Sequence, residues 1–301
     1  MSYAKVIINP LARGGRTEKI WPHINELLTE TGISFDHDFT EGVGHGTELA
    51  REAVEKGYEL VVAVGGDGTV NEVVNGLVDE EGKGRATLGI ISTGTGGDCV
   101  RTLGIPRDYT KVCRLFSDLK GLTIDLGAVE YVSDNQRVRR FYINTAGLGF
   151  DAAVVERTRR FKAMGGTIPF VMGFLFTFIT YNGKNVAVVI DGDKEEERDL
   201  LIMVNNGRYA GGGMKFTPNA DPGDGFLDVV IIGDMGKMRL LWNFPRLYRG
   251  THITHPKVKM SRTKSVEVES VETMLLQVDG ELVGQAPASF WVLPAALTVA
   301  V

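Results

Sequence analysis

The first 125 residues alternate between apolar, strand-like runs and segments with helical spacing. Leu60 to Val64 and Leu88 to Ile91 are apolar throughout, as in parallel strands that are buried on both faces. Thr47 to Lys56 has helical spacing and is followed by Gly57, a typical helix end. Two further strands are expected at Lys5 to Asn9 and Ile33 to Phe39. The pattern predicts a doubly wound α/β domain, whose ligands bind at the carboxyl ends of the strands.

After Asp125 the pattern becomes strand-rich. Strands are predicted at Ile124 to Tyr131, Arg140 to Thr145, Asn185 to Asp191, Leu200 to Asn205, Phe226 to Ile232, Ser265 to Glu269 and Met274 to Val278. Residues 151–181 form the only substantial helical region expected among them. The sequence therefore predicts an α/β domain over 1–125 and a β-rich, sandwich-like domain over 126–293. A last strand, Leu297 to Val301, could return to either domain.

Length and composition limit the classes of protein. A chain of 301 residues is long enough for two domains with their own cores. The 43% hydrophobic and 24% charged residues are typical of a globular protein, and the net charge of −5 argues against general nucleic-acid binding. Cys99 and Cys113 are too few for a disulfide framework, and the first residues enter a strand pattern directly. We therefore expect a cytoplasmic protein without a signal peptide.

The charge is unevenly distributed. From Gly236 to Lys264 the chain has no Asp or Glu, and it carries eight basic residues: Lys237, Arg239, Arg246, Arg249, Lys257, Lys259, Arg262 and Lys264. Such a stretch is either a solvated face or a region attracted to anionic lipid head groups.

The most apolar run is Ile168 to Tyr181. It is too short to cross a membrane, which takes about 20 residues, and Pro169 and Gly173 interrupt it. A buried core helix is one interpretation. Four basic residues precede the run, so a surface that docks on a bilayer and admits an acyl chain is the other. These are Arg157, Arg159, Arg160 and Lys162.

A glycine turn follows the predicted strand at 60–64 and leads into a helix-compatible segment. In Gly65-Gly66-Asp67-Gly68-Thr69, glycines let backbone N–H groups approach an anion, and the helix end adds partial positive charge. The turn lacks the lysine of a Walker loop, and Asn71 stands at the third glycine position of a dinucleotide fingerprint. The turn is therefore a phosphate site of another kind or an ordinary tight connection.

Three other loops follow strands of the same predicted sheet. Asn9, Thr40 and Gly94-Thr95 each come directly after a strand, so they should gather at one sheet edge. His45, in the loop after Thr40, could be a general base, although a loop-packing histidine is favoured.

Two acidic turns lie in the second half. Asp221 to Asp228 holds three aspartates with a proline and two glycines, which fits either turn chemistry or a hard cation such as Mg²⁺. Asp279-Gly280 between two apolar runs indicates a β-hairpin.

Residues 65–73, GGDGTVNEV, resemble the GGDGTxNEV signature of the diacylglycerol kinase catalytic domain. Other motifs of that family follow in order over nearly the whole chain. They are Asn9-Pro10, Gly94 to Asp98, Asp221 to Asp228, Asp279 to Glu281 and Leu293 to Ala296. One position departs, because Gly97 replaces the usual Asn and removes any hydrogen bond made through that side chain.

The resemblance implies a set of site residues. It places ATP at Asn9, Thr40, Gly65, Gly66, Asp67, Gly68, Thr69, Val70, Asn71 and Thr95. Asp67 would act on the phosphates or their metal. A structural Mg²⁺ would bind the carboxylate of Asp224 and backbone oxygens of Asp221 and Phe226. Phosphoryl transfer needs a carboxylate near the attacking hydroxyl, and Asp279 and Glu281 are both candidates. The strand 294–301 would return to the first domain.

The expected function is that of a cytoplasmic, ATP-dependent lipid kinase, peripheral at the inner membrane face, with a homodimer as an open alternative to a monomer. By resemblance the favoured acceptor is diacylglycerol; sphingoid bases, ceramide and other long-chain lipids stay open. The alternatives are an NAD kinase, which also uses a GGDGT turn, and a non-catalytic nucleotide or lipid sensor. Asn71-Glu72-Val73 and Asp279-Gly280-Glu281 favour the lipid kinase over the first, and the intact carboxylate motifs count against the second.

Overall fold

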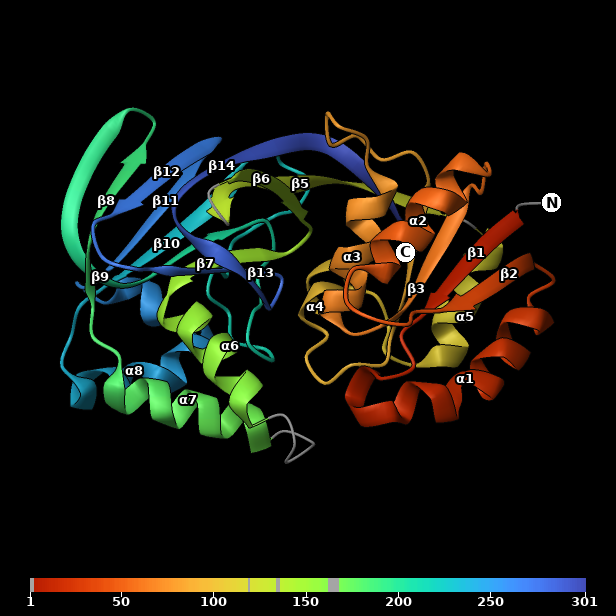
Figure 1. Cartoon of the computed structure of the whole chain (residues 1–301), viewed down its shortest axis with the longest axis horizontal. Helices are drawn as coiled ribbons and strands as arrows, with labels where there is room; N and C mark the ends of the chain where they lie inside the picture. The colour runs from red at the N-terminus through yellow and green to blue at the C-terminus, as the bar shows by residue number, and fades with distance from the viewer. Residues whose placement is uncertain (1–2, 119, 134–135, 162–167) are drawn as a thin grey trace. The chain divides into compact units, whose positions relative to one another are not determined.

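The computed structural model describes residues 3–118, 120–133, 136–161 and 168–301. The chain divides into two compact units (Figure 1). Unit 1 comprises Met1–Leu126 and Leu293–Val301, and unit 2 comprises Gly127–Val292. The chain therefore passes from unit 1 into unit 2 and returns for its last nine residues.

Unit 1 is a parallel sheet flanked by helices. Its strands are β1 (Tyr3–Ile8), β2 (Ser34–Phe39), β3 (Leu60–Gly65), β4 (Thr87–Ser92) and the end of β14 (Glu281–Ala300). Its helices are α1 (Ala12–Glu30), α2 (His45–Glu55), α3 (Asp67–Leu77), α4 (Asp98–Leu103) and α5 (Tyr109–Asp118). The strand order is β14-β4-β3-β1-β2, and every pair is parallel. The doubly wound α/β prediction is confirmed.

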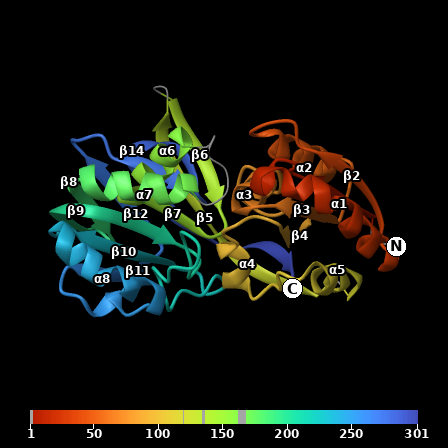
Figure 2. The ribbon, with the colours of Figure 1, turned by 90° about the horizontal axis from the view of Figure 1, so that it is seen from below.

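The burial of these strands follows their sequences. All six residues of β3 are buried, because strands pair on both of its sides and helices cover both of its faces. β2, SFDHDF, pairs only with β1 and is largely exposed, which suits an edge strand. The helices α1 and α5 pack together, as do α2 and α3, on opposite faces of the sheet (Figures 1 and 2).

Unit 2 is built from antiparallel strands and, among the residues that the structure describes, three α-helices. Its strands are the second half of β5 (Gly121–Ser133), β6 (Gln136–Tyr142), β7 (Thr145–Gly149), β8 (Lys184–Ile190), β9 (Asp193–Asn205), β10 (Leu227–Gly233), β11 (Val258–Thr263), β12 (Ser265–Ser270), β13 (Leu275–Val278) and the start of β14. Its helices are α6 (Phe150–Arg160), α7 (Ile168–Thr180), α8 (Lys237–Arg249) and the 3₁₀ helix η2 (His252–Thr254). The strand-rich prediction for this half is confirmed.

Unit 2 has two apolar clusters. The strand β9 changes partners along its length: its first half pairs with β8, and its second half pairs with β7 and β10. This change lets the strands enclose a core that includes Tyr142, Ile202 and Phe290. A second cluster, which includes Val230 and Leu247, lies on the side of α8.

The helix α8 was not expected. Residues 151–181 were predicted as the only substantial helical region of this half, and α8 corrects that prediction. The reason is physical. Its inward-facing stripe is short: Leu247 is buried, Leu240 and Phe244 are only partly buried against the second cluster, and the other large apolar side chains of the helix are exposed.

Candidate active site

The two glycine loops of unit 1 touch each other at the carboxyl ends of β3 and β4. The backbone N–H groups of Thr93 and Gly94 donate to the carbonyl of Gly65 at 2.8 and 3.2 Å. A Cβ atom on Gly94 would lie 2.6 Å from the Cα of Gly66, so only glycine permits this approach. The loop after β3 leads straight into α3, whose first N–H groups have no partner within the helix. The predicted phosphate site thus has the required backbone.

Asp67 joins these loops. One of its carboxylate oxygens accepts a hydrogen bond from the Gly97 N–H at 2.9 Å, and the other accepts from the Cys99 N–H at 3.3 Å. The carboxylate therefore fixes the start of α4 against the start of α3. Asp67 was expected to act on phosphates or their metal; the structure gives it a positioning role as well. Each carboxylate oxygen keeps a further lone pair for such an interaction.

Gly97, the position that departs from the family motif, has φ +62° and ψ +38°. This left-handed conformation is open to Gly and to Asn, so the replacement keeps the backbone shape. A Cβ atom here would lie 3.1 Å from the guanidinium of Arg107, which donates to the Gly94 carbonyl at 3.1 Å. Arg107 thus occupies the space beside Gly97. No sequence motif marked it, because its role depends on the fold.

The remaining predicted nucleotide residues differ in how they could contact a ligand. The Asn9 amide donates to the Thr69 hydroxyl at 3.0 Å, which links the loop after β1 to the first turn of α3. The Thr40 N–H donates to the Ile8 carbonyl at 2.8 Å, and Thr95 is exposed. Val70 and Asn71 are buried inside unit 1, and the Val70 N–H already donates to the Gly66 carbonyl at 3.1 Å, so neither side chain is exposed to a nucleotide.

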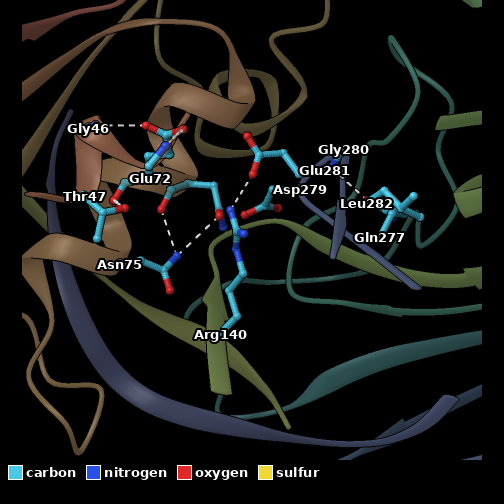
Figure 3. Close-up of polar contacts among 12 residues, drawn as sticks. Gly46, Thr47, Glu72, Asn75, Arg140, Gln277, Asp279, Gly280, Glu281 and Leu282 are labelled. Atoms are coloured by element: carbon cyan, nitrogen blue, oxygen red, sulfur yellow. Dashed lines mark hydrogen bonds and ion pairs between the residues drawn. The ribbon is translucent and has the colours of Figure 1, made fainter. Parts of the chain in front are cut away.

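The loop after Thr40 is held by a residue of the signature segment. The Glu72 carboxylate accepts hydrogen bonds from the N–H groups of Gly44 and Gly46 at 2.9 and 3.0 Å (Figure 3). It therefore caps the start of α2 from α3. His45 accepts a hydrogen bond from the Glu41 N–H at 2.9 Å through Nδ1, which is the loop-packing arrangement.

In unit 2, Asp279 and Gly280 form the two-residue turn between β13 and β14. Both residues have positive φ, +46° and +85°, as the tightest hairpins require. The Asp279 carboxylate accepts three backbone hydrogen bonds, of 3.0, 3.1 and 2.8 Å, from residues 143, 144 and 145. It is 5% exposed. This carboxylate holds the turn between β6 and β7 and is shielded from water.

Glu281 is placed differently. Its carboxylate forms an ion pair of 2.5 Å with the guanidinium of Arg140, and about a quarter of the side chain, 26%, is exposed (Figure 3). The sequence offered Asp279 and Glu281 as equal candidates for the base. Their surroundings favour Glu281, because an attacking hydroxyl must reach the carboxylate. Arg140, which orients Glu281, carried no signal in the sequence.

The buried carboxyl group of Asp151 is linked to the hairpin turn at Gly280 through the side chain of Gln277. The Gly280 N–H donates to the Gln277 side-chain oxygen at 2.8 Å, and the Gln277 amide donates to Asp151 at 2.9 Å. The other oxygen of Asp151 is buried without a hydrogen-bond partner. Burial raises the pKa of Asp151 to about 6.

We expect Asp151→Asn to stabilise the protein at neutral pH and to have little effect in acid. In the unfolded chain the carboxyl ionises near pH 3.9. In the folded protein, where the pKa is about 6, it stays protonated up to about that pH. The folded state thus binds the extra proton, and stability falls as pH rises from about 4 to about 6. The shift corresponds to at most about 3 kcal/mol.

Thermal unfolding of wild type and variant at both ends of this range measures the effect. Asn keeps an oxygen that accepts from Gln277, so the two proteins should unfold at similar temperatures near pH 4. A difference in unfolding temperature that does not change with pH would contradict the assignment.

In the loop 221–228, which the sequence predicts to bind a cation, a nearby guanidinium already balances part of the negative charge. Asp224 forms an ion pair with Arg262, and its other oxygen accepts from the Phe226 N–H at 3.0 Å. The Arg262 guanidinium also lies 4.6 Å from the centre of the Phe226 ring. Burial, and secondarily the charge of Asp224, raise the pKa of Asp228 to about 6.

The residues of this loop fit a cation only in part. Within the described ranges, no group of three His, Cys, Asp or Glu side chains is arranged to hold a metal. The Asp224 carboxylate and the carbonyls of the turn could serve one, with Arg262 as a competitor for the carboxylate.

Comparison with known proteins identifies the family. Residues 3–129 match the diacylglycerol kinase catalytic domain, and residues 144–301 match the YegS C-terminal NAD kinase beta sandwich-like domain. A diacylglycerol kinase of Mycobacterium tuberculosis is 31% identical over 97% of this chain and 93% of its own. One of Staphylococcus carnosus is 29% identical over 95% and 91%. The chain belongs to the diacylglycerol kinase family and is a kinase, as its signature motifs indicated.

Solved structures agree on the fold. A diacylglycerol kinase from Bacillus anthracis superimposes with a TM-score of 0.74 at 24% identity, covering 99% of this chain and 96% of that one. Yeast NADH kinase, crystallised with NADH, gives a TM-score of 0.56 at 13% identity, covering 99% and 82%. The α/β unit followed by a strand-rich unit is therefore common to both kinds of kinase.

Proposed function

We propose that this kinase transfers the γ-phosphoryl group of ATP to a hydroxyl group of a membrane lipid, with diacylglycerol as the favoured acceptor. The observation that carries the proposal is the pair of glycine loops in unit 1, joined by Asp67. They offer backbone N–H groups and a helix N-terminus to a polyphosphate, on a chain whose curated relatives are named diacylglycerol kinases.

Each unit supplies a separate part of the chemistry. In unit 1 the loops after β1, β2, β3 and β4 would bind and orient the nucleotide. In unit 2 the Glu281 carboxylate would accept the proton of the attacking hydroxyl, and Arg140 would hold that carboxylate in place. Asp279 would act through the backbone, by fixing the turn that presents Glu281. Mg²⁺ bound to ATP would supply positive charge to the phosphates.

A lipid panel tests the proposal. Purified protein is incubated with labelled ATP and diacylglycerol, a sphingoid base, ceramide or NAD, each in turn. We expect label on diacylglycerol. Label on another lipid would change the acceptor and keep the reaction, whereas label on NAD would overturn the proposal in favour of the soluble kinase. Binding of ATP without transfer to any acceptor would indicate a sensor.

We further propose a structural cation in the 221–226 turn, and expect Asp224→Ala to lower thermal stability more than ATP affinity. The turn belongs to unit 2, whereas the phosphate loops belong to unit 1. The measurement is thermal unfolding with and without EDTA, paired with calorimetric ATP titration. Arg262→Gln is the matched control, because it removes the competing guanidinium. The effect of EDTA on its unfolding temperature should equal or exceed the effect on the wild type. An EDTA response that is equally absent in wild type and both variants would remove the cation from this site.

A further inference from the structure

The helix α7 exposes an uninterrupted apolar face. Its sequence, IPFVMGFLFTFIT, contains no charged residue. Only Pro169, Gly173 and Thr177 are buried. Seven large apolar side chains are exposed by 37 to 63%: Ile168, Phe170, Val171, Met172, Leu175, Phe176 and Ile179. A helix on the surface of a protein in water ordinarily places polar side chains at such positions, so this face indicates a partner.

The helix α8 lies beside α7 and extends that face. The rings of Phe174 and Phe244 are 5.0 Å apart and join the two helices, which the two ribbon views also show as neighbours (Figures 1 and 2). On α8 the exposed apolar residues are Met238, Leu241, Trp242 and Tyr248, with Trp242 exposed by 80%. We call the exposed apolar residues of both helices the α7–α8 face.

The charges carried by the two helices themselves have one sign. α8 carries Lys237, Arg239, Arg246 and Arg249, and neither helix has an acidic residue. Among the described residues, none of these four forms an ion pair with a carboxylate. The basic residues of β11 differ, because Lys259 pairs with Glu195 and Glu197, and Arg262 pairs with Asp224. The basic stretch of the sequence thus has two parts: the positive charges of β11 are largely paired with carboxylates, and those of α8 are not.

We infer that the α7–α8 face inserts into the interface of an anionic bilayer, with the basic residues of α8 at the head groups. An apolar face with Trp and Tyr beside Lys and Arg is the chemistry of helices that lie in the plane of a membrane. No helix in the described part of the chain is long and apolar enough to cross one. The inference rests on the proposed lipid acceptor and adds the surface by which the enzyme reaches it.

A second copy of the chain fits this face less well. A symmetric dimer through α8 would bring the same four basic residues of both copies together, without a carboxylate on either helix to balance them. Anionic lipid supplies the missing charge. Lys162, which the sequence grouped with the basic residues before α7, lies outside the described residues.

Trp242 offers a direct test by fluorescence. Of the three tryptophans, Trp21 is buried and Trp291 is half-buried, so the highly exposed Trp242 should dominate any change in emission. Vesicles of phosphatidylcholine with phosphatidylglycerol should shift the emission to shorter wavelength, and brominated lipids should quench it. Trp242→Phe should still sediment with these vesicles but lose most of the shift. Unchanged emission of the wild type on vesicle binding would overturn the inference.

Paired substitutions test the energetic contribution. Leu241→Gln with Trp242→Gln should lower the affinity for these vesicles at least about tenfold, because two large apolar side chains no longer leave water. Both residues are exposed, so thermal unfolding should be unchanged. Val271→Gln, at a position exposed by 92% in the loop between β12 and β13, is the matched control and should bind like wild type.

Two outcomes separate the inference from its alternatives. Equal vesicle binding of wild type and the double variant would overturn it. If the wild type is a dimer and the double variant a monomer with unchanged vesicle binding, the face is an interface between copies. Neither measurement uses ATP or an acceptor, so vesicle binding can be interpreted even if the lipid kinase assay fails.

Discussion

Glu281→Gln is expected to lower the rate of phosphoryl transfer to diacylglycerol by at least about 10²-fold, the scale for loss of a general base. ATP affinity should change little, because Glu281 lies in unit 2 and the predicted nucleotide loops lie in unit 1. The amide keeps the size of the side chain and an oxygen that accepts from Arg140. The measurements are steady-state turnover with ATP and diacylglycerol, and calorimetric ATP titration.

Asp279→Asn is the matched control, and it should behave differently. Its amide keeps one acceptor oxygen and replaces the other by an NH2 group, so at least one of the three backbone N–H groups would lose its acceptor and the variant should lose stability. Glu281→Gln should unfold at the wild-type temperature. Near-normal turnover in Glu281→Gln would mean that the base lies elsewhere. A folded Asp279→Asn that loses activity, beside an active Glu281→Gln, would assign the base to Asp279.

Asp67→Ala is expected to weaken ATP binding and to lower turnover by about 10²-fold or more, because small displacements of a binding loop have effects of that size. The variant loses the hydrogen bonds to the N–H groups of Gly97 and Cys99, and the two phosphate loops lose the carboxylate that joins them. Asp67→Asn should fall between Ala and wild type, since it keeps one acceptor oxygen. ATP titration and turnover measure both variants. Wild-type affinity and rate in Asp67→Ala would contradict the assignment.

Much of unit 1 could be predicted because two signals coincide there. β3 is apolar throughout, β4 is apolar from Leu88 to Ile91, and a glycine loop follows each strand. A strand buried on both faces and a glycine turn at its end are both local features. The loop contacts between Gly65 and Gly94 then follow from the parallel pairing of adjacent strands.

The difference between Asp279 and Glu281 could not be predicted, because it depends on groups distant in the sequence. The backbone around residue 144 reaches one carboxylate, and Arg140 reaches the other. Arg107 beside Gly97 is a similar case. The helix α8 escaped prediction for another reason: periodicity detects an apolar stripe that faces a core, and in α8 exposed apolar residues such as Trp242 obscure that stripe, which is short.

The return of the last strand to unit 1 has a consequence for synthesis on the ribosome. The partner of β4 at Val299 is translated only after all of unit 2, so the sheet of unit 1 stays one strand short until then. An unpaired strand edge is prone to pairing with other chains. Residues 1–126 expressed alone should therefore aggregate more readily than a circularly permuted chain in which residues 293–301 precede residue 3. The nascent enzyme depends on its last nine residues to close that edge.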